Sequence, residues 1–322
     1  MEALMQRRAL FALPLAAPAV ASAQGRYPDR PIRLILPWPP GGSADSQLRS
    51  IAELASRELG QPVVIENRSG AGGTLHAVHL AREARPDGYT LGQMHLSVVR
   101  RPFLVRTPQW DATKDFTHII GMTGWLFGIA VRADSPFQSF REMITYAKAN
   151  PGKLSFSTSG IATSNHLAME DIIAREGVEI THVPFRGASE GITAVLSGSV
   201  SMIADSSAWA GNVEAGQMRL LCVWSEERAP RFPNVPTLKE VGHDMVVTSP
   251  YGVSGPPRMD PGVVRVLHDV MHRGLMSPEN TRVRAQFDMP LAYLNTEQYQ
   301  DFIVRRAAYE QEIVTRLGIR ME

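Results

Sequence analysis

A turn rich in proline and glycine, residues 37–45, has the composition best suited to binding chemistry. Its prolines stiffen the chain, whereas Gly41 and Gly42 let the backbone approach a ligand closely. Ser43 or Asp45 can cap the helix that follows. Because the turn contains no Lys or Arg, an anion bound there would be held by backbone N–H groups and the helix dipole. Taken alone, such a turn favours an ordinary strand-to-helix connection, and a binding site requires a second turn facing it.

The pentapeptide at 187–191, Gly-Ala-Ser-Glu-Gly, matches the G-x-S-x-G pattern of a hydrolase nucleophile elbow. It falls between a predicted strand and a predicted helix, and Asp244 and His268 or His272 follow in the chain order of a catalytic triad. An exported serine esterase that uses Ser189 is therefore the alternative function. Motifs of five residues match often by chance, so we expect a protein without enzymatic activity.

Two histidine pairs at helical spacing, His76/His79 and His268/His272, are weak metal-site signals. Asp269 stands where the zinc helix H-E-x-x-H has Glu, and the sequence offers no evident third ligand. We interpret both pairs as solvated helix faces. The glycine-rich turn at 70–74 lacks the Lys of a phosphate-binding loop, which favours a packing role. We therefore expect no metal and no cofactor.

Elements of alternating type must position these turns. Apolar runs predict strands at 32–36, 62–66, 89–95, 117–122, 128–131, 154–157, 180–183, 200–204, 220–224 and 246–253. Amphipathic segments predict helices at 45–59, from the 70–74 turn to about 85, and at 139–149, 165–175, 190–196, 261–275, 278–287 and 296–317. This alternation indicates an α/β fold with largely parallel sheets.

The strand–helix pattern restarts near Gly124, which predicts two lobes with the second inserted into the first. We expect residues 24–123 and 241–322 to form the first lobe and residues 124–240 the second. Ligands of such sheets lie at the carboxyl ends of strands, against helix N-termini. The first lobe supplies the turn at 39–45 and the second lobe supplies turns at 158–165 and 186–189, so we predict a ligand cleft between the lobes.

Composition limits the class of protein. The 322 residues are 44% hydrophobic and 20% charged, which is typical of a globular protein rather than a disordered one. A formal net charge of +1 without a basic stripe disfavours nucleic acid as a partner. Cys222 is the single cysteine, so an internal disulfide is excluded, and its apolar neighbours predict a buried strand position.

The N-terminus has the pattern of a signal peptide at residues 1–23. Arg7 and Arg8 precede an apolar segment at 9–20, and Ala21-Ser22-Ala23 fits a cleavage site. Export without disulfides favours a bacterial periplasm. No later segment reaches about 18 apolar residues, so we expect no stable membrane insertion, and we expect a monomer.

Nine short stretches match one family pattern in order, and they span nearly the whole mature chain. They lie at 27–33, 37–45, 60–68, 70–73, 85–90, 147–154, 166–170, 182–187 and 235–242. The second of them includes Pro39-Pro40-Gly41-Gly42-Ser43, and the eighth ends in Pro184-Phe185-Arg186-Gly187. Together they resemble the periplasmic substrate-binding proteins of tripartite tricarboxylate transporters, also called the Bug family.

The resemblance implies a type II periplasmic-binding-protein fold, in which a hinge joins two Rossmann-like α/β lobes around an interlobe ligand cleft. It also implies capture of a small organic carboxylate (a di- or tricarboxylate, an amino acid or an aromatic acid) for a membrane transporter or a sensor. Backbone groups and ordered waters typically hold the carboxylate in this family. Carried over by motif, the ligand contacts are Trp38, Pro40, Gly41, Gly42, Ser43, Asp45, Thr158, Ser159, Gly160, Ser164 and His166, and the cleft is also lined by Arg186, Gly187 and Asp205. Bracing of their own helices is an equal alternative for Asp45 and His166.

The chain departs from the family pattern at positions that affect the pocket. His95 and Ser97 replace a strand end that is commonly rich in Ser, Thr and Asn, Trp125 lies at the predicted crossing, and Tyr251 stands in place of a tryptophan. If His95, Trp125, Phe127 and Tyr251 face the cleft, the pocket is more aromatic than a simple dicarboxylate requires, and we expect His95, Trp125 and Tyr251 to set the choice of ligand. Core packing is the alternative for all of them, and it is the preferred interpretation for Phe127.

Overall fold

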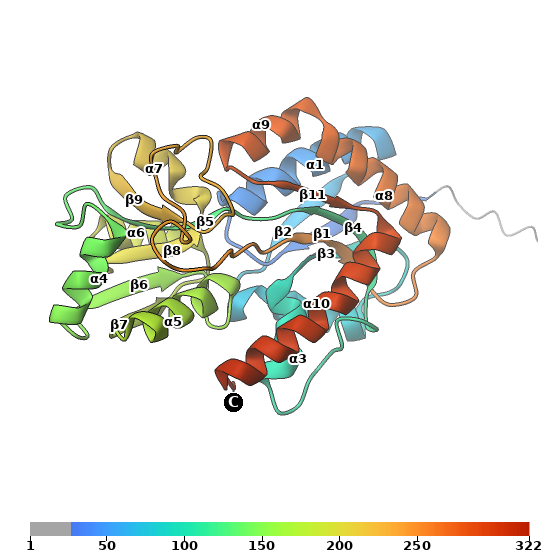
Figure 1. Cartoon of the computed structure of the whole chain (residues 1–322). Helices are drawn as coiled ribbons and strands as arrows, with labels where there is room; N and C mark the ends of the chain where they lie inside the picture. The colour runs from blue at the N-terminus through green and yellow to red at the C-terminus, as the bar shows by residue number, and fades with distance from the viewer. Residues whose placement is uncertain (1–26, 322) are drawn as a thin grey trace, which may run out of the picture.

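A computed structural model describes residues 27–321, in two lobes built on one sheet each (Figure 1). The predicted signal peptide lies outside these residues. The strands are β1 (Ile32–Leu36), β2 (Val63–Asn67), β3 (Thr90–His95), β4 (Thr117–Thr123), β5 (Phe127–Arg132), β6 (Leu154–Thr158), β7 (Ile180–Pro184), β8 (Met202–Ser206), β9 (Met218–Val223), β10 (Tyr251–Gly255) and β11 (Leu291–Leu294). The first lobe holds a six-stranded sheet in the order β11-β4-β10-β3-β1-β2, and the second holds a five-stranded sheet in the order β7-β6-β8-β5-β9.

Helices cover both faces of each sheet. They are α1 (Ser43–Leu59), α2 (Leu75–Val78), α3 (Leu96–Leu104), α4 (Phe140–Ala149), α5 (Ser164–Glu176), α6 (Ala188–Leu196), α7 (Ala210–Glu214), α8 (Pro261–Met276), α9 (Pro278–Gln286) and α10 (Thr296–Leu317), with short turns η1 (Ala71–Gly73), η2 (His79–Glu83) and η3 (Ser207–Trp209). In the first lobe α1, α8 and α9 lie on one face of the sheet, and α3 and α10 lie on the other (Figure 1). None of the helices within residues 27–321 combines the length and apolarity needed to cross a bilayer.

The prediction of largely parallel sheets is wrong, because both sheets are mixed. Four strand pairings are parallel, and all of them join β1, β2 and β3 or β6, β7 and β8. Five pairings are antiparallel, and each involves β5 or β10 or joins β11 to β4. Antiparallel neighbours need no helical crossover between them. The strands β5 and β10, which follow the two crossings between the lobes, both pair with antiparallel neighbours.

Most predicted elements are present, but three were missed and one is shorter than predicted. Helix α3 begins directly after β3 with no turn between them, and residues 94–99 contain no Gly or Pro to signal the change from strand to helix. The short elements α7 and β11 were also missed. The predicted strand 246–253 is present only as β10, because the segment before it has no regular structure.

Two crossings join the lobes. The first is short, since β4 ends at Thr123 and β5 begins at Phe127. The second is the segment between β9 and β10, where the Val247 N–H donates to the Trp224 carbonyl oxygen at 2.9 Å. Cys222 is fully buried in β9, as predicted. The predicted lobe boundaries remain predictions, and the strand membership of the two sheets supports them.

Candidate ligand-binding site

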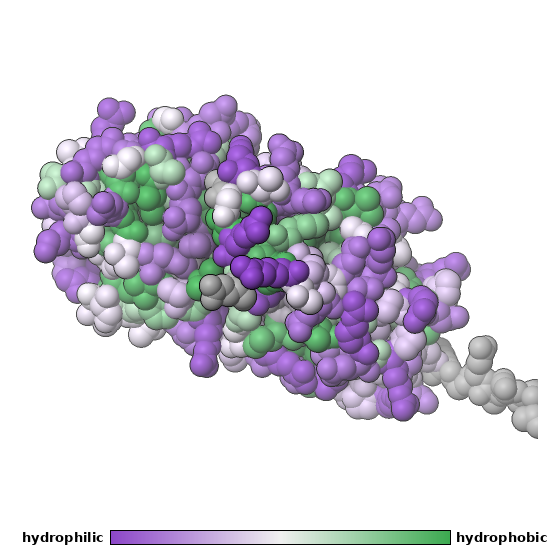
Figure 2. All heavy atoms as spheres, turned by 90° about the horizontal axis from the view of Figure 1, so that it is seen from below, coloured by the Kyte–Doolittle hydropathy of each residue, from purple (hydrophilic) through white to green (hydrophobic). Residues whose placement is uncertain are grey.

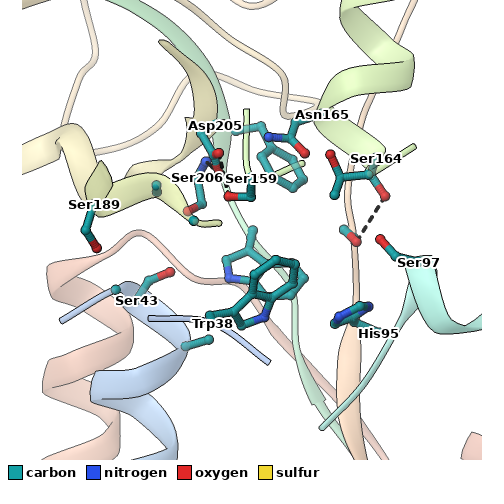
Figure 3. A pocket seen from close by; sticks show the side chains of 18 of the residues that line it. Trp38, Ser43, His95, Ser97, Ser159, Ser164, Asn165, Ser189, Asp205 and Ser206 are labelled. Carbon is teal, nitrogen blue, oxygen red and sulfur yellow. Dashed lines mark hydrogen bonds between the residues drawn. The ribbon is translucent and has the colours of Figure 1, made fainter. Parts of the chain in front are cut away.

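A narrow cavity of about 50 Å³ lies between the lobes, at the carboxyl ends of strands from both sheets (Figure 3). It is lined by Trp38, Pro39, Gly42, Ser43, Ala44, His95, Ser97, Trp125, Phe127, Ser159, Thr163, Ser164, Asn165, Gly187, Ala188, Ser189, Asp205, Ser206 and Ser249. Of these described lining residues, none is Lys or Arg. Any anion in the cavity must therefore be held by neutral groups.

Four helix N-termini meet at this cavity. The N-cap residues of α1, α3, α5 and α6 all line it, and they are Gly42, His95, Thr163 and Gly187. Thr163 caps its own helix, because its hydroxyl accepts from the N–H of His166. The N-caps of α1 and α6 are glycines, which have no side chain to make such a bond, and among the described residues the side chain of His95 makes none at the start of α3. Uncapped first-turn N–H groups carry a partial positive charge and are suited to hold an anion.

The N-termini of α1 and α6 come from different lobes and lie close together. A Cβ atom on Gly187 would lie 2.5 Å from Cδ of Pro39, so the two turns can touch only because residue 187 is glycine. Nearby, a Cβ on Gly160 would lie 3.1 Å from Cα of Gly72, and the φ of Gly160 is +126°. The structure thus shows the two lobes closed against each other around the cavity.

An aromatic wall forms one side of the cavity. The rings of Trp38 and His95 lie 4.9 Å apart between centroids, and those of Trp38 and Trp125 lie 6.0 Å apart at 89°. Nε1 of Trp38 donates to Oε1 of Gln93 at 2.7 Å, which fixes the orientation of the indole. Burial lowers the pKa of His95 to about 3, so this ring is neutral at physiological pH.

The opposite side carries hydroxyls and one acid (Figure 3). Oγ of Ser159 donates to Asp205 at 2.6 Å, and the backbone N–H of Ser206 donates to the other carboxylate oxygen at 2.6 Å. Burial raises the pKa of Asp205 to about 6 despite these bonds. The cavity is therefore uncharged or singly negative, according to the protonation of one side chain.

Ten of the predicted site residues line the cavity. They are Trp38, Gly42, Ser43, His95, Ser97, Trp125, Ser159, Ser164, Gly187 and Asp205. The structure places the other predicted residues outside its lining, and they are Pro40, Gly41, Asp45, Thr158, Gly160, His166, Arg186 and Tyr251. Several of these eight instead brace the groups that do line it.

Asp45 braces the first-lobe turn. Its carboxylate accepts the Gly41 N–H at 3.0 Å, and it also bonds to the side chains of Arg49 and Asn67. Burial alone would raise the pKa of Asp45, but these hydrogen bonds outweigh burial and lower it. The contacts of Asp45 therefore support a role in bracing the turn rather than in contacting the ligand.

His166 and Tyr251 also support neighbouring groups. Nδ1 of His166 accepts the N–H of Ala162 at 3.1 Å, which braces the loop before α5. Tyr251 is buried with its ring 4.4 Å from that of Trp125, and its hydroxyl donates to the side chain of Gln47. Arg186 is exposed and lies just before the α6 turn.

Nine lining residues were not among the predicted ligand contacts. They are Pro39, Ala44, Phe127, Thr163, Asn165, Ala188, Ser189, Ser206 and Ser249. Six of them lie in the turns at 39–45, 158–165 and 186–189 that were predicted to supply the cleft, and these six are Pro39, Ala44, Thr163, Asn165, Ala188 and Ser189. Phe127 is a buried core residue, as preferred from the sequence, with 4% of its side chain exposed. It also lines the cavity.

The triad of the esterase alternative is not assembled. Ser189 lines the cavity, but Asp244 borders a separate groove beside α5 and α10. His268 bonds to Tyr293 and to Asp269, and His272 packs on the same tyrosine. Seen from below, the surface where the two lobes meet shows hydrophobic residues among hydrophilic ones (Figure 2).

The interpretation of the histidine pairs as solvated faces is wrong for His76. His76 is 1% exposed with Nε2 2.8 Å from the carbonyl oxygen of Gln93, and burial lowers its pKa to about 4. His79, His268 and His272 are half-buried, the last two against Tyr293. Among residues 27–321, no group of three or more His, Cys, Asp or Glu side chains is arranged to hold a metal ion.

Two α/β lobes, two crossings and an interlobe cavity at strand ends define a protein of the type II periplasmic-binding class. The chain belongs to the tripartite tricarboxylate transporter receptor family, whose TctC model matches residues 47–319. It is 43% identical to the "UPF0065 protein in gbd 5'region" of Cupriavidus necator over 97% of this chain and 94% of that protein.

Solved structures agree with this membership. The periplasmic binding protein BugD is 28% identical, with a TM-score of 0.87 over 92% of this chain and 100% of that one. Rpa4515 of R. palustris, solved with adipate, is 28% identical, with a TM-score of 0.84 over 91% of this chain and 99% of that one. The comparisons therefore confirm the predicted family and fold class.

Proposed function

We propose that this chain is an exported periplasmic solute-binding protein that captures a small organic carboxylate between its lobes. The observation that carries the proposal is the meeting of the α1 and α6 N-termini, one from each lobe, at a cavity whose described lining has no cationic side chain. A carboxylate can accept N–H bonds from both helices at once. The adipate of the related Rpa4515 supports a carboxylate ligand, and the periplasmic relative BugD supports the location.

Capture is coupled to closure of the lobes. Each lobe alone offers the ligand one uncapped helix N-terminus of this pair, so the bound anion favours the state in which the second helix reaches it. The crossings at 124–126 and 224–250 are the hinge in this proposal. The boundaries between the lobes, which are 24–123 with 241–322 and 124–240, fall at the start of the first crossing and within the second. The closed form is then recognised by a tripartite tricarboxylate-type transporter or by a sensor.

The protein acts as a monomer and without catalysis in this proposal. Ser189 contributes an N-terminal position of α6 rather than a nucleophile. Ester hydrolysis should therefore be absent from the purified protein, and replacement of Ser189 by Ala should leave no activity to lose. Hydrolysis that disappears in Ser189→Ala would instead support the esterase.

Thermal unfolding in the presence of acids tests the proposal. A panel of aliphatic, amino and aromatic acids is compared with the matching carboxamides, which lack the negative charge. A ligand at 100 times its Kd should stabilise the protein by about 2.7 kcal/mol. Stabilisation by at least one acid and not by its amide is expected, and a panel in which no carboxylate stabilises the protein would contradict the proposal.

A further inference from the structure

The aromatic wall faces the cavity as a largely apolar surface. Because the indole N–H of Trp38 is already bonded to Gln93, that ring offers the cavity carbon atoms rather than a hydrogen-bond donor. Trp125 meets Trp38 edge to face, and Phe127 extends the wall with its ring centroid 6.3 Å from that of Trp125. Rings placed in this way present edges and faces that another ring can pack against in the same offset or edge-to-face geometry.

The wall is held rigid from behind. Tyr251 is 1% exposed and packs 4.4 Å from Trp125 between ring centroids, and its hydroxyl is anchored on Gln47 of α1. A planar ligand would therefore find its packing surface already formed, and little side-chain freedom would be lost on binding.

The charges in the cavity suit one carboxylate better than two. Asp205 lies in the lining, and the described lining contains no Lys or Arg to neutralise a further negative group. A second carboxylate would lose its water without gaining a cation, and it would be repelled by Asp205. Ser43 and Ser189 lie on one side of the cavity, near the paired α1 and α6 termini (Figure 3).

The side opposite those termini has no charged side chain in the described lining, and α3 and α5 begin there. Ser97 and Ser164 lie there with hydroxyl groups, and Oγ of Ser164 donates to Oγ of Ser249 at 3.2 Å (Figure 3). These hydroxyls can bond to a neutral substituent such as a phenolic hydroxyl.

We infer that the preferred ligand is an aromatic monocarboxylate, with its carboxylate at the α1 and α6 N-termini and its ring against Trp38 and Trp125. This inference rests on the proposed function, because it assumes that a carboxylate occupies the cavity. It names a ligand class with one charged end and a planar apolar body.

Isothermal titration calorimetry on the mature chain tests the inference with benzoate and 4-hydroxybenzoate against adipate and malate. At least one aromatic acid should bind at least about tenfold more tightly than either dicarboxylate. Trp38→Leu should reduce this preference by about tenfold, and Trp125→Leu provides a second test if the first variant does not fold. Tyr146→Leu is the matched control, because Tyr146 is an exposed aromatic on α4 outside the cavity, and it should leave both affinities unchanged.

The possible results distinguish failure of the aromatic-ligand inference from failure of the proposed function. Tighter binding of adipate or malate than of either aromatic acid would overturn the inference and leave the proposed function standing. An aromatic preference that persists unchanged in both tryptophan variants would also overturn it, since the wall would not be its source. Binding of no carboxylate of either kind would contradict the proposed function itself.

Discussion

Arg100 of α3 reaches across the cleft and donates a hydrogen bond to the carbonyl oxygen of Ala162, 2.8 Å away in the other lobe. A second bond runs to Oγ of Ser164, the first residue of α5, at 3.3 Å. The guanidinium is paired with Glu310, which is 0% exposed and is also bonded to Arg306. Ala162 has a φ of +58°, so Arg100 holds a backbone conformation that few alanines adopt. Both bonds join the two lobes in the arrangement that the structure shows.

Replacement of Arg100 should therefore weaken both stability and binding. Arg100→Met removes the two cross-lobe bonds and one partner of a buried ion pair, which should cost about 3 kcal/mol in the free energy of unfolding. The affinity for the carboxylate should fall by about tenfold, because the closed state loses contacts that the open state lacks. Denaturant unfolding and calorimetry measure the two effects. Arg175→Met is the control, because Arg175 forms a more exposed ion pair with Asp171 and lines the same groove beside α5 and α10 as Arg100. A loss of stability with unchanged affinity would refute a role of Arg100 in closure.

Gly187 should be required for closure because of the space it leaves. A methyl group at this position would meet the ring of Pro39 at 2.5 Å and would force the α1 and α6 termini apart. Overpacking of this kind costs about 1–3 kcal/mol, so Gly187→Ala should reduce affinity by about tenfold or more. Gly211→Ala in α7 is the matched control, because a Cβ there has no atom within 4 Å. Equal affinities for both variants would show that the two turns need not touch.

Binding of a carboxylate should be tighter at pH 6 than at pH 8. Burial raises the pKa of Asp205 from 3.8 to about 6, so its contribution to folding stability is fully present below pH 3.8 and is lost as the pH rises through 6. A bound anion in the same cavity raises this pKa further, and binding then takes up a proton. The affinity should increase several-fold from pH 8 to pH 6, and His95 does not titrate in this range because burial lowers its pKa to about 3.

Asp205→Asn provides the control for this pH dependence. The variant keeps the size of the side chain and cannot take up the proton, so its affinity should be nearly constant between pH 6 and pH 8. Calorimetry in two buffers of different ionisation enthalpy measures the proton uptake directly. A pH dependence that survives in the variant would assign the effect to another group.

The brace at Asp45 should matter for the turn that it holds. Asp45→Ala leaves the Gly41 N–H without its acceptor and removes one of the two acceptors of the Asn67 side-chain amide, at a cost of about 1–3 kcal/mol in unfolding free energy. The Gly42–Ala44 backbone should then lose its fixed orientation, and ligand affinity should fall as well. Glu53→Ala, on the exposed side of α1, is the control. Thermal unfolding measures the loss of stability, and calorimetry measures the loss of affinity. A loss of stability with unchanged affinity would contradict the role of Asp45 in orienting the turn for the ligand.

Local sequence signals predicted the parts of the site that depend on local chemistry. The turn before α1 and the turn before α6 each contain the glycine and the helix start that make them recognisable, and both line the cavity. Helix α3 was missed because it follows β3 without a turn.

Contacts distant in sequence could not be predicted. The bond of Tyr251 to Gln47 spans 204 residues, and that of Arg100 to Glu310 spans 210. Nothing in the neighbouring residues of either partner specifies the other. For the same reason, Asp45 and Tyr251 were predicted as ligand contacts although they support the turn and the aromatic wall from behind.

A crystal structure with the tightest-binding acid tests the central claim most directly. The account predicts carboxylate oxygens within roughly 2.7–3.2 Å of backbone N–H groups at the start of α1 and at the start of α6, so that one anion joins both lobes. A carboxylate that contacts only one lobe, or that is held by a Lys or Arg side chain, would contradict it.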